Sequence, residues 1–528
     1  MPAMNTGRRD AALAAGIFVG ALAWFAWQPR NLGPADESFF LVEAMRMAGG
    51  ERLYQDLFWF GMPGGHWLLA GAFSVFGASI VVAKMTMGVV NALSAALTFA
   101  ASRALAVRPL LAVLPALAFL ALAQPAWPYV SAHWMSTTLI LAVFLLAVSA
   151  RALEQRARLV AIGLALGTLG AVYQQKAPVI AVGVGVAILL ACWIRRDPAA
   201  PPWYARLALV TTGVLLVIVP VVALMVATVD TALLINDLVR FPLVNYRQWH
   251  QAVTWGSVAP ITQNLAAYVW PHLLAGLPLF LAIGAGSVAI GCRSGWSRAR
   301  VVQWSTALLL CGAAALAIGY NDDFIHIAFI AAPFFVLAAL LLEAALALVP
   351  ERSRPLASAL LAAVIGAELV IHLAHNATRM RAEYPIAAET HFGRVDFHTP
   401  QEVALSVMLE RHLDQTASRV VFAYPSYAAF YLTAGGHNPT RYQFLHPALS
   451  LPEQLTDARA VLEAKQVPLV IVFKGVLQPD DPIVAFLATR YDVVEEKDGW
   501  TVYRRRSDAA AAADRSAGNG VNALVPAL

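Results

Sequence analysis

Asp36 and Glu37 are adjacent carboxylates that follow the first long apolar segment of the chain. An amphipathic, helical stretch continues from them to Ala48, so the pair is expected at a lipid–water interface. One carboxylate in such a place could accept a proton from a hydroxyl group as a general base. The alternative is that Asp36 only caps a helix beginning at Glu37, and the sequence leaves both interpretations open.

Histidines also gather on one side of the apolar part of the chain. Each maps to a loop or helix end on the same predicted face as Asp36, and the loops of the opposite face contain none. An ionisable residue near apolar segments is costly unless it is paired or lines a wet cavity, so a polar cavity is expected there. These histidines are His66, His133, His250, His272, His326, His372 and His375.

The composition shows which kind of protein must position these groups. Of 528 residues, 59% are hydrophobic and 13% are charged, against about 25% charged in soluble domains. A single core stops growing near about 250 to 300 residues, so the excess apolar surface must face lipid and an ordinary soluble enzyme is excluded. No basic run indicates nucleic acid. Cys192, Cys292 and Cys311 are expected to be free thiols.

Runs of about 20 apolar residues are long enough to cross a bilayer core as helices. About eleven such runs predict a polytopic α-helical membrane protein. The first run follows Arg8 and Arg9 and has no small-residue cleavage site before Trp24, so we expect it to remain as an anchor. The predicted spans are residues 11–28, 79–102, 109–123, 134–150, 159–173, 177–194, 207–229, 264–291, 301–318, 327–349 and 356–374.

The arginines set the expected orientation, because cytoplasmic loops carry an excess of Lys and Arg. Arginine-rich loops alternate with arginine-poor ones, starting with Arg8 and Arg9, so the N-terminus is predicted to be cytoplasmic. Residues 64–76 are apolar but too short to span, and counting them would reverse this bias. We interpret them as re-entrant or interfacial. Residues after about 375 are then expected outside the cytoplasm.

The chain changes character after this point, so we predict a membrane domain over 1–375 and a small extracytoplasmic α/β domain over 376–506. Apolar runs there shorten to strand length at 420–423, 467–473 and 501–504, and alternate with helical stretches at 400–413 and 453–465. Lys497, Asp498 and Gly499 suit a hairpin turn. Residues 507–528 are rich in Ala, Asp, Gly and Asn and are expected to be disordered.

Short motifs along nearly the whole chain resemble those of a known family. They are Asp36-Glu37, Tyr54-Gln55-Asp56, Pro63-Gly64, Ser131-Ala132-His133-Trp134, Gln174-Gln175-Lys176, Phe241-Pro242-Leu243 with Tyr246, Asn321-Asp322-Asp323 with His326, and Asn438-Pro439-Thr440-Arg441-Tyr442. Together they resemble the membrane glycosyltransferases of the GT-C fold. This superfamily includes the protein O-mannosyltransferases and the bacterial transferase that adds aminoarabinose to lipid A.

The resemblance implies transfer of a sugar, with inversion, from a polyprenyl-phosphate carrier to an extracytoplasmic lipid, glycan or protein. It also implies a location in the bacterial inner (plasma) membrane. Asp36 is similar to the family's catalytic aspartate, with Glu37 orienting the acceptor or a metal. Because a lipid phosphate is already a good leaving group, the site needs a base for the acceptor and cations for the phosphate.

The same resemblance implies that Lys176, Arg240 and Arg247, together with Tyr246, bind the donor phosphate. For each cation the alternative is that the long side chain snorkels to lipid headgroups. Asp322, Asp323 and His326 lie at one predicted helix start and, with His133, are candidates to bind substrate or a divalent metal. A helix cap for the aspartates and a simple hydrogen-bonding role for His133 remain the alternatives.

Two other functions fit the same pattern. A transporter or flippase for a lipid-linked sugar would also need a polar outer cavity, and should have charged residues near helix midpoints and related halves. A non-catalytic member could use its outer domain to bind a partner in the cell wall. The sequence does not identify the sugar, the acceptor, the metal or the oligomeric state.

Overall fold

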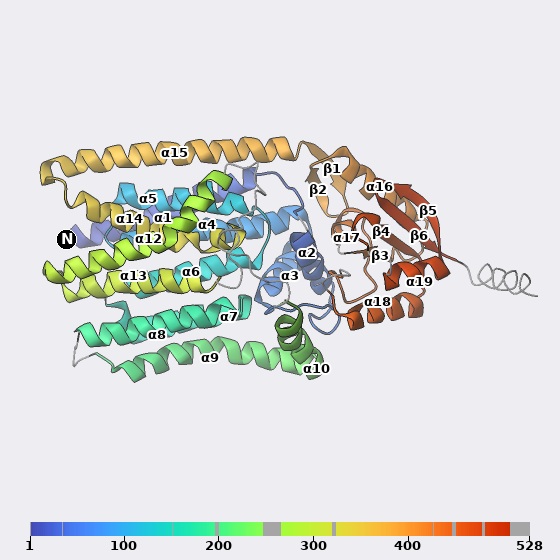
Figure 1. The fold of residues 1–528 in the computed structure, drawn as a ribbon, viewed down its shortest axis with the longest axis horizontal. Helices are drawn as coiled ribbons and strands as arrows, with labels where there is room; N and C mark the ends of the chain where they lie inside the picture. Colours follow the sequence, from blue (N-terminus) through green and yellow to red (C-terminus); the bar gives the residue numbers. More distant parts are fainter. Residues whose placement is uncertain are drawn as a thin grey trace, which may run out of the picture.

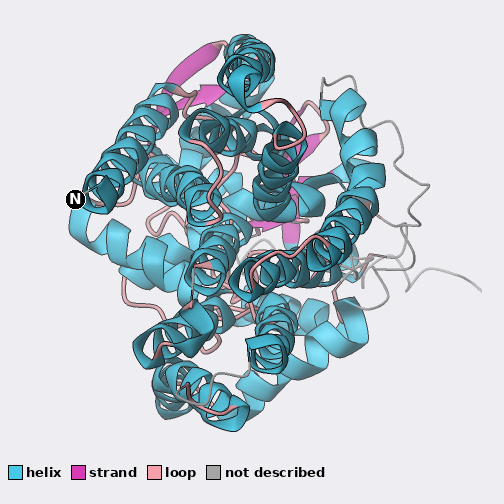
Figure 2. Cartoon of the chain, turned by 90° about the vertical axis from the view of Figure 1, so that its left-hand side faces the viewer, coloured by secondary structure: helices cyan, strands magenta, loops and turns pink. Residues whose placement is uncertain are grey.

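A computed structural model describes residues 2–33, 35–149, 151–195, 200–246, 266–318, 324–425, 427–445, 450–477 and 481–506. These residues form a long bundle of helices with a smaller α/β region at one end, next to the short helices α2 and α3 (Figure 1). Viewed from the other end, most of the bundle helices are seen along their axes (Figure 2). A helical part and a smaller region that contains the sheets can therefore be distinguished, while the predicted domain boundary near residue 375 stays a prediction.

Each predicted apolar span folds as a helix where it is described. Eight helices are long and apolar enough to cross a membrane, so the chain is an integral membrane protein, and the count of about eleven crossings stays a prediction. The helices are α1 (Pro2–Trp27), α4 (Ile80–Ala104), α5 (Pro109–Ala118) with η1 (Phe119–Ala123) and η2 (Gln124–Ala126), α6 (Ala132–Val148), α7 (Arg156–Val172), α8 (Lys176–Arg195), α9 (Trp203–Thr228), α12 (Ala266–Arg293), α13 (Arg298–Leu316), α14 (Phe324–Leu346) and α15 (Arg354–Glu383).

The helices differ sharply in how much of their apolar surface the protein buries. Of its most apolar stretch, α14 buries 67%, whereas α1 buries 6% and α15 buries 11%. Large apolar side chains such as Leu360 and Val364 therefore remain exposed on α15. Exposed apolar surface of this extent suits contact with lipid, so α14 forms the centre of the bundle and α1 and α15 lie at its edge.

Two glycines bring α7 and α9 into backbone contact. A Cβ atom added at Gly163 would collide with the carbonyl of Val210, and one at Gly213 would collide with the carbonyl of Val160. Small residues at such crossings let membrane helices approach closely, where dispersion contacts replace the hydrophobic effect. This packing holds α7, which ends just before Lys176, in a defined position.

The helices α2 (Ala35–Ala48) and α3 (Gly64–Phe76) lie at the bundle end that carries the α/β region (Figure 1). With 13 residues, α3 is shorter than the roughly 20 needed to span, which agrees with a re-entrant or interfacial segment. A Cβ at Gly64 would lie 2.7 Å from the Ala171 carbonyl oxygen, and one at Gly65 would lie 3.0 Å from the Phe40 ring. Because these glycines have no side chain, α3 can pack closely against both α2 and α7.

The α/β region begins after α15, which continues to Glu383, so the last long helix extends past the predicted boundary at residue 375. A β1–β2 hairpin is followed by a four-stranded sheet in the order β3-β4-β6-β5, in which only β3 and β4 are parallel. The elements are β1 (Ile386–Thr390), β2 (Gly393–Phe397), α16 (Pro400–Asp414), β3 (Val421–Tyr424), α17 (Ala429–Thr433), α18 (Pro452–Ala464), β4 (Leu469–Phe473), α19 (Pro482–Arg490), β5 (Tyr491–Lys497) and β6 (Trp500–Arg505).

The predicted strands and helices of this region are confirmed to within a few residues. The predicted hairpin turn is also confirmed, because Asp498 and Gly499 join β5 to β6 with positive φ values of 50° and 81°. Aspartate and glycine tolerate this left-handed backbone better than other residues, which is why the turn could be found from sequence. The expected disorder of residues 507–528 lies outside the described residues.

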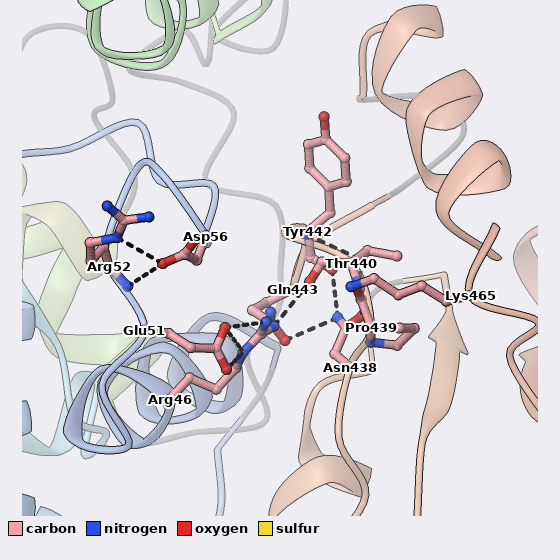
Figure 3. A network of polar contacts seen from close by, with 10 residues as sticks. All are labelled: Arg46, Glu51, Arg52, Asp56, Asn438, Pro439, Thr440, Tyr442, Gln443 and Lys465. Atoms are coloured by element: carbon pink, nitrogen blue, oxygen red, sulfur yellow. Dashed lines mark hydrogen bonds and ion pairs between the residues drawn. The ribbon is translucent and has the colours of Figure 1, made fainter. Parts of the chain in front are cut away.

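Arginines hold the α/β region against the first loop of the membrane part. Arg46 on α2 forms an ion pair with Glu51 at 2.5 Å and donates a hydrogen bond to the Thr440 carbonyl at 3.0 Å (Figure 3). The Asn438 side chain braces the same segment by donating to the Tyr442 carbonyl and the Gln443 side chain. The segment 438–443 therefore has one defined conformation against α2.

Arg441 ties three separate segments together. Its guanidinium forms an ion pair with Asp237 on η4 (Asn236–Arg240) at 2.5 Å and donates to the Tyr54 carbonyl at 2.5 Å. Its own carbonyl accepts a hydrogen bond from the Phe58 backbone. The Asp237 side chain is fully buried, and removing one partner of a buried pair leaves an uncompensated charge. This contact couples the α/β region to two loops of the membrane part.

We expect Asp237 to make stability depend on pH. Burial raises the pKa of its carboxyl to about 6, against the opposing effects of Arg441 and Asn236, whereas an unfolded aspartate titrates near 3.9. Between these values the folded state binds more protons than the unfolded state. The free energy of unfolding should therefore fall by about 3 kcal/mol as the pH rises from about 4 to about 6.

Unfolding midpoints of the detergent-solubilised chain across this pH range measure the effect. Asp237→Asn should flatten the dependence, because the amide does not titrate. Asp230→Asn is the matched control, since Asp230 caps the neighbouring α10 (Thr231–Ile235) at an exposed position and asparagine caps equally well. The same slope in Asp237→Asn and in the unsubstituted chain would show that another group causes it.

Candidate active site

Asp36 lies in the first turn of α2, which begins at Ala35, so it is not the N-cap of a helix starting at Glu37. Its side chain is exposed and has no hydrogen bond or ion pair among the described residues. Nearby protein still removes part of the water around the carboxyl, and this desolvation raises its pKa, while the positive field of His326 opposes the rise. Asp36 is thus an open carboxylate with the character of a base.

Glu37, by contrast, is fully enclosed and fully bonded. Its Oε1 accepts hydrogen bonds from the Lys84 ammonium at 2.8 Å and the Val130 backbone N–H at 2.6 Å. Its Oε2 accepts from the backbone N–H of Gly33 at 2.5 Å. These bonds join the loop before α2 to α4 and to the segment before α6. The arrangement supports a positioning role for Glu37 more than direct contact with an acceptor.

Lys176 begins α8 and is completely buried. Its ammonium donates to the Ser136 hydroxyl at 2.9 Å, lies 3.3 Å from His133 Nδ1, and lies 4.6 Å from the centre of the Tyr173 ring. A side chain enclosed in this way does not snorkel to lipid headgroups. The alternative that the sequence left open for Lys176 is therefore wrong, because Ser136 and His133 offer the ammonium partners inside the protein.

His133 connects this lysine to His326. The two imidazole rings lie 4.9 Å apart, and His133 also stacks on Phe329 with ring centres 4.3 Å apart. Its Nε2 lies 3.2 Å from the Tyr173 hydroxyl. His326, His133 and Lys176 therefore form a connected group of polar side chains. Asp36 is close enough to His326 for the imidazole to act on its carboxyl electrostatically, but it is not bonded to this group among the described residues. The structure brings these four predicted residues together from α2, α14, α6 and α8.

Besides Lys176, Arg240 is the predicted donor-phosphate residue whose side chain the structure describes, and its contacts lie elsewhere. Arg240 is exposed and faces Glu453 of the α/β region, with their nearest atoms 3.9 Å apart. Tyr246 is the last residue of η5 (Pro242–Tyr246). Arg247, Asp322 and Asp323 lie outside the described residues, as do the roles predicted for them.

No metal site can be assigned within the described ranges, where no cluster of three or more His, Cys, Asp or Glu side chains has the arrangement to hold an ion. The predicted set of Asp322, Asp323, His326 and His133 is only half described, so a divalent metal stays a prediction. His133 is occupied by Tyr173 and Lys176, which agrees with the hydrogen-bonding interpretation of this residue.

Two polar pairs near the site were missed by the sequence analysis. Lys84 is the partner of Glu37, and the signal was a lone lysine in an apolar run, which must be paired if it is buried. Glu43 and His66 form a buried pair at 2.7 Å beside the Phe40 and Trp59 rings. Their separation of 23 residues gave no local signal. Pairs of this kind are visible only in the folded chain.

The fold and the site together define a polytopic membrane protein with an open carboxylate, imidazoles and a buried ammonium at the bundle end that carries an α/β region. No protein-family profile matches the sequence, and no curated protein matches it by sequence. The solved structures are therefore the comparison that defines the fold.

The chain is similar to ArnT from Cupriavidus metallidurans over almost its whole length. The form bound to undecaprenyl phosphate shares 13% identity with a TM-score of 0.53, covering 96% of this chain and 99% of that chain. The apo form shares 14% identity with a TM-score of 0.55, covering 95% and 98%. At this identity the likeness establishes the fold alone, and it confirms the fold that the sequence motifs predicted.

The Glu37–Lys84 pair should be essential for stability. Glu37→Gln removes the charge that neutralises Lys84, whose side chain is only 15% exposed, so unfolding should become easier by about 3 kcal/mol. Adding Lys84→Met should restore part of this loss, because the unpaired charge is then gone. Thermal unfolding in detergent measures both changes.

Arg52→Met is a suitable control, because the Arg52–Asp56 pair is exposed and should contribute at most about 1 kcal/mol. If Glu37→Gln is no worse than Arg52→Met, the buried pair does not hold the loop before α2.

Proposed function

We propose that this chain is an inverting glycosyltransferase that moves a sugar from a polyprenyl-phosphate carrier to an acceptor on the extracytoplasmic face of a bacterial inner membrane. The observation that carries the proposal is the open carboxylate of Asp36, held at the end of a GT-C bundle beside His326. A base in this position can serve an acceptor hydroxyl.

In the proposed reaction, Asp36 takes the proton of the acceptor hydroxyl as the oxygen attacks the anomeric carbon. The bond between that carbon and the carrier phosphate breaks, and its electron pair leaves with the phosphate oxygen. Attack from the side opposite the leaving phosphate inverts the anomeric configuration. The raised pKa of Asp36 suits this role, because a more basic carboxylate accepts the proton more readily.

Lys176 is the buried lysine that contacts His133, and we assign it the positive charge that acts on the donor phosphate. Its ammonium donates to Ser136 and lies beside His133, so it orients the imidazole that in turn contacts His326. In a site that excludes water, a fixed cation stabilises a developing phosphate charge more than it would in water. We therefore propose Lys176 as the cation for the donor phosphate, acting through space or through the His133 and His326 rings.

The carrier chemistry is supported by the comparison with ArnT, which was solved with undecaprenyl phosphate bound. The predicted arginine bias supports the extracytoplasmic position of the site. The transporter alternative has less support, because Glu343 and Glu368, the acids inside predicted spans, pair locally with Arg108 and His372. Neither acid is connected to the group formed by His326, His133 and Lys176 among the described residues.

Asp36→Asn should lower sugar transfer by at least about a hundredfold, the low end for loss of a general base. The assay is transfer from a radiolabelled polyprenyl-phosphate sugar by the purified chain. Unfolding midpoints should stay unchanged, because Asp36 makes no contact that stabilises the described fold. Asp230→Asn controls for the change of charge at the same end of the molecule. Wild-type turnover in Asp36→Asn would remove this carboxylate from the mechanism.

Lys176→Met keeps the aliphatic stem and removes the ammonium. If Lys176 serves the donor phosphate, the variant should lose about tenfold or more in kcat/KM for the lipid donor, with a much smaller effect on acceptor KM. Lys176→Arg should restore part of the rate, because the positive charge returns. Equal effects on donor and acceptor would instead indicate that Lys176 only packs the site.

A further inference from the structure

A second polar cavity lies in the α/β region, away from Asp36. It is a groove of about 850 Å³ at one end of the four-stranded sheet, within the range of about 300 to 1,000 Å³ found for ligand sites. Its walls come from the loop between α16 and β3, the segment 437–439, the turn between α18 and β4, and the end of β6. Every lining residue belongs to the α/β region.

The groove is strongly basic. Lys465, Arg504, Arg505 and Arg506 line it together with His437, and no Asp or Glu is among its lining residues. Its remaining polar groups are the amides and hydroxyls of Gln415, Thr416, Ser418 and Gln466. Cations that converge on a concave surface focus a positive potential there, so the groove will attract an anion.

Two of these cations, Arg504 and Lys465, form no ion pair with an Asp or Glu among the described residues. Arg505 and Arg506 are compensated from outside the groove by Glu463 at 3.0 Å and Asp492 at 2.8 Å. Arg504 instead donates to the neutral Gln415 side chain at 2.6 Å and lies beside His412, and Lys465 donates to the Pro439 carbonyl at 2.7 Å.

These contacts orient the Arg504 and Lys465 side chains without a direct ion pair to a described carboxylate. In addition, Arg504 Nε is buried without a hydrogen-bond partner in the described structure.

We propose that this groove binds an anionic oligosaccharide, with carboxylate or phosphate groups on Arg504 and Lys465 and sugar hydroxyls on the neighbouring amides and hydroxyls. Arginine recognises both anionic groups through paired N–H donors. No Phe, Tyr or Trp is among the described residues that line the groove, so the large aromatic platforms on which nucleic-acid bases usually stack are missing there. Its concave shape also fits a chain better than the flat surface of a bilayer.

The groove is separate from the site at Asp36. The segment 438–440 stands between them, with Arg46 and α2 on one side and Lys465 on the other (Figure 3). Binding in the groove therefore does not depend on the proposed sugar transfer. A protein anchored in the membrane could use it to hold an acidic envelope glycan close to the bilayer.

The test is binding of fluorescent tetragalacturonate to the full chain in detergent, followed by anisotropy. Arg504→Gln and Lys465→Gln should each weaken binding about tenfold or more, and added salt should weaken it further. Lys474→Gln is the matched control, because it removes one positive charge at the opposite end of β4, where Lys474 pairs with Glu496. The control should bind as the unsubstituted chain does.

Competitors then identify the chemistry of the ligand. Tripolyphosphate competing better than galacturonate would assign phosphate groups, and the reverse would assign carboxylates. Tight binding of neutral maltotetraose, or tighter binding of a DNA oligonucleotide, would overturn the proposal. So would undiminished binding by both groove variants with unchanged unfolding midpoints, or an equal loss in Lys474→Gln.

Discussion

The position of Asp36 depends on the hydrogen bonds that the buried carboxylate of Glu37 accepts. Its two oxygens accept hydrogen bonds from Gly33, Val130 and Lys84, so the start of α2 is joined to two other parts of the bundle. A Cβ at residue 33 would lie 2.7 Å from a Glu37 oxygen, so glycine is required there. With its neighbour held this firmly, Asp36 is carried on a fixed helix start while its own carboxylate stays free.

Arginines perform the corresponding task for the α/β region. Arg46 reaches out from α2 to Thr440, while Arg441 reaches back to Asp237 and Tyr54. The short segment between Asn438 and Gln443 is therefore held by hydrogen bonds and ion pairs to α2, to the loop at Tyr54 and to η4. Its outer surface also forms a wall of the basic groove. The segment 438–443 thus contacts the membrane part on one side and the basic groove of the α/β region on the other.

Much of this architecture was predictable because it follows from local patterns. Apolar runs must become helices in lipid, where no water can satisfy the backbone, and every predicted span is helical where it is described. The Lys497-Asp498-Gly499 turn and the apolar run at 501–504 were enough to predict a hairpin turn followed by β6, whereas β5 was not predicted as a strand. Lys84 was visible as an intramembrane charge, but its partner was not, since Glu37 is 47 residues away.

The sequence by itself determined the helical membrane class and the α/β region, because residue types and periodicity carry that information. The candidates Asp36, His133, Lys176 and His326 came from the resemblance of its short motifs to the GT-C glycosyltransferases. Only the tertiary structure decided which candidates meet. It buried Lys176 against Ser136 and His133, placed His326 near Asp36, and directed Arg240 toward Glu453 instead. The reason is physical: contacts between distant segments depend on how helices pack, and packing is set by shape and burial across the whole bundle.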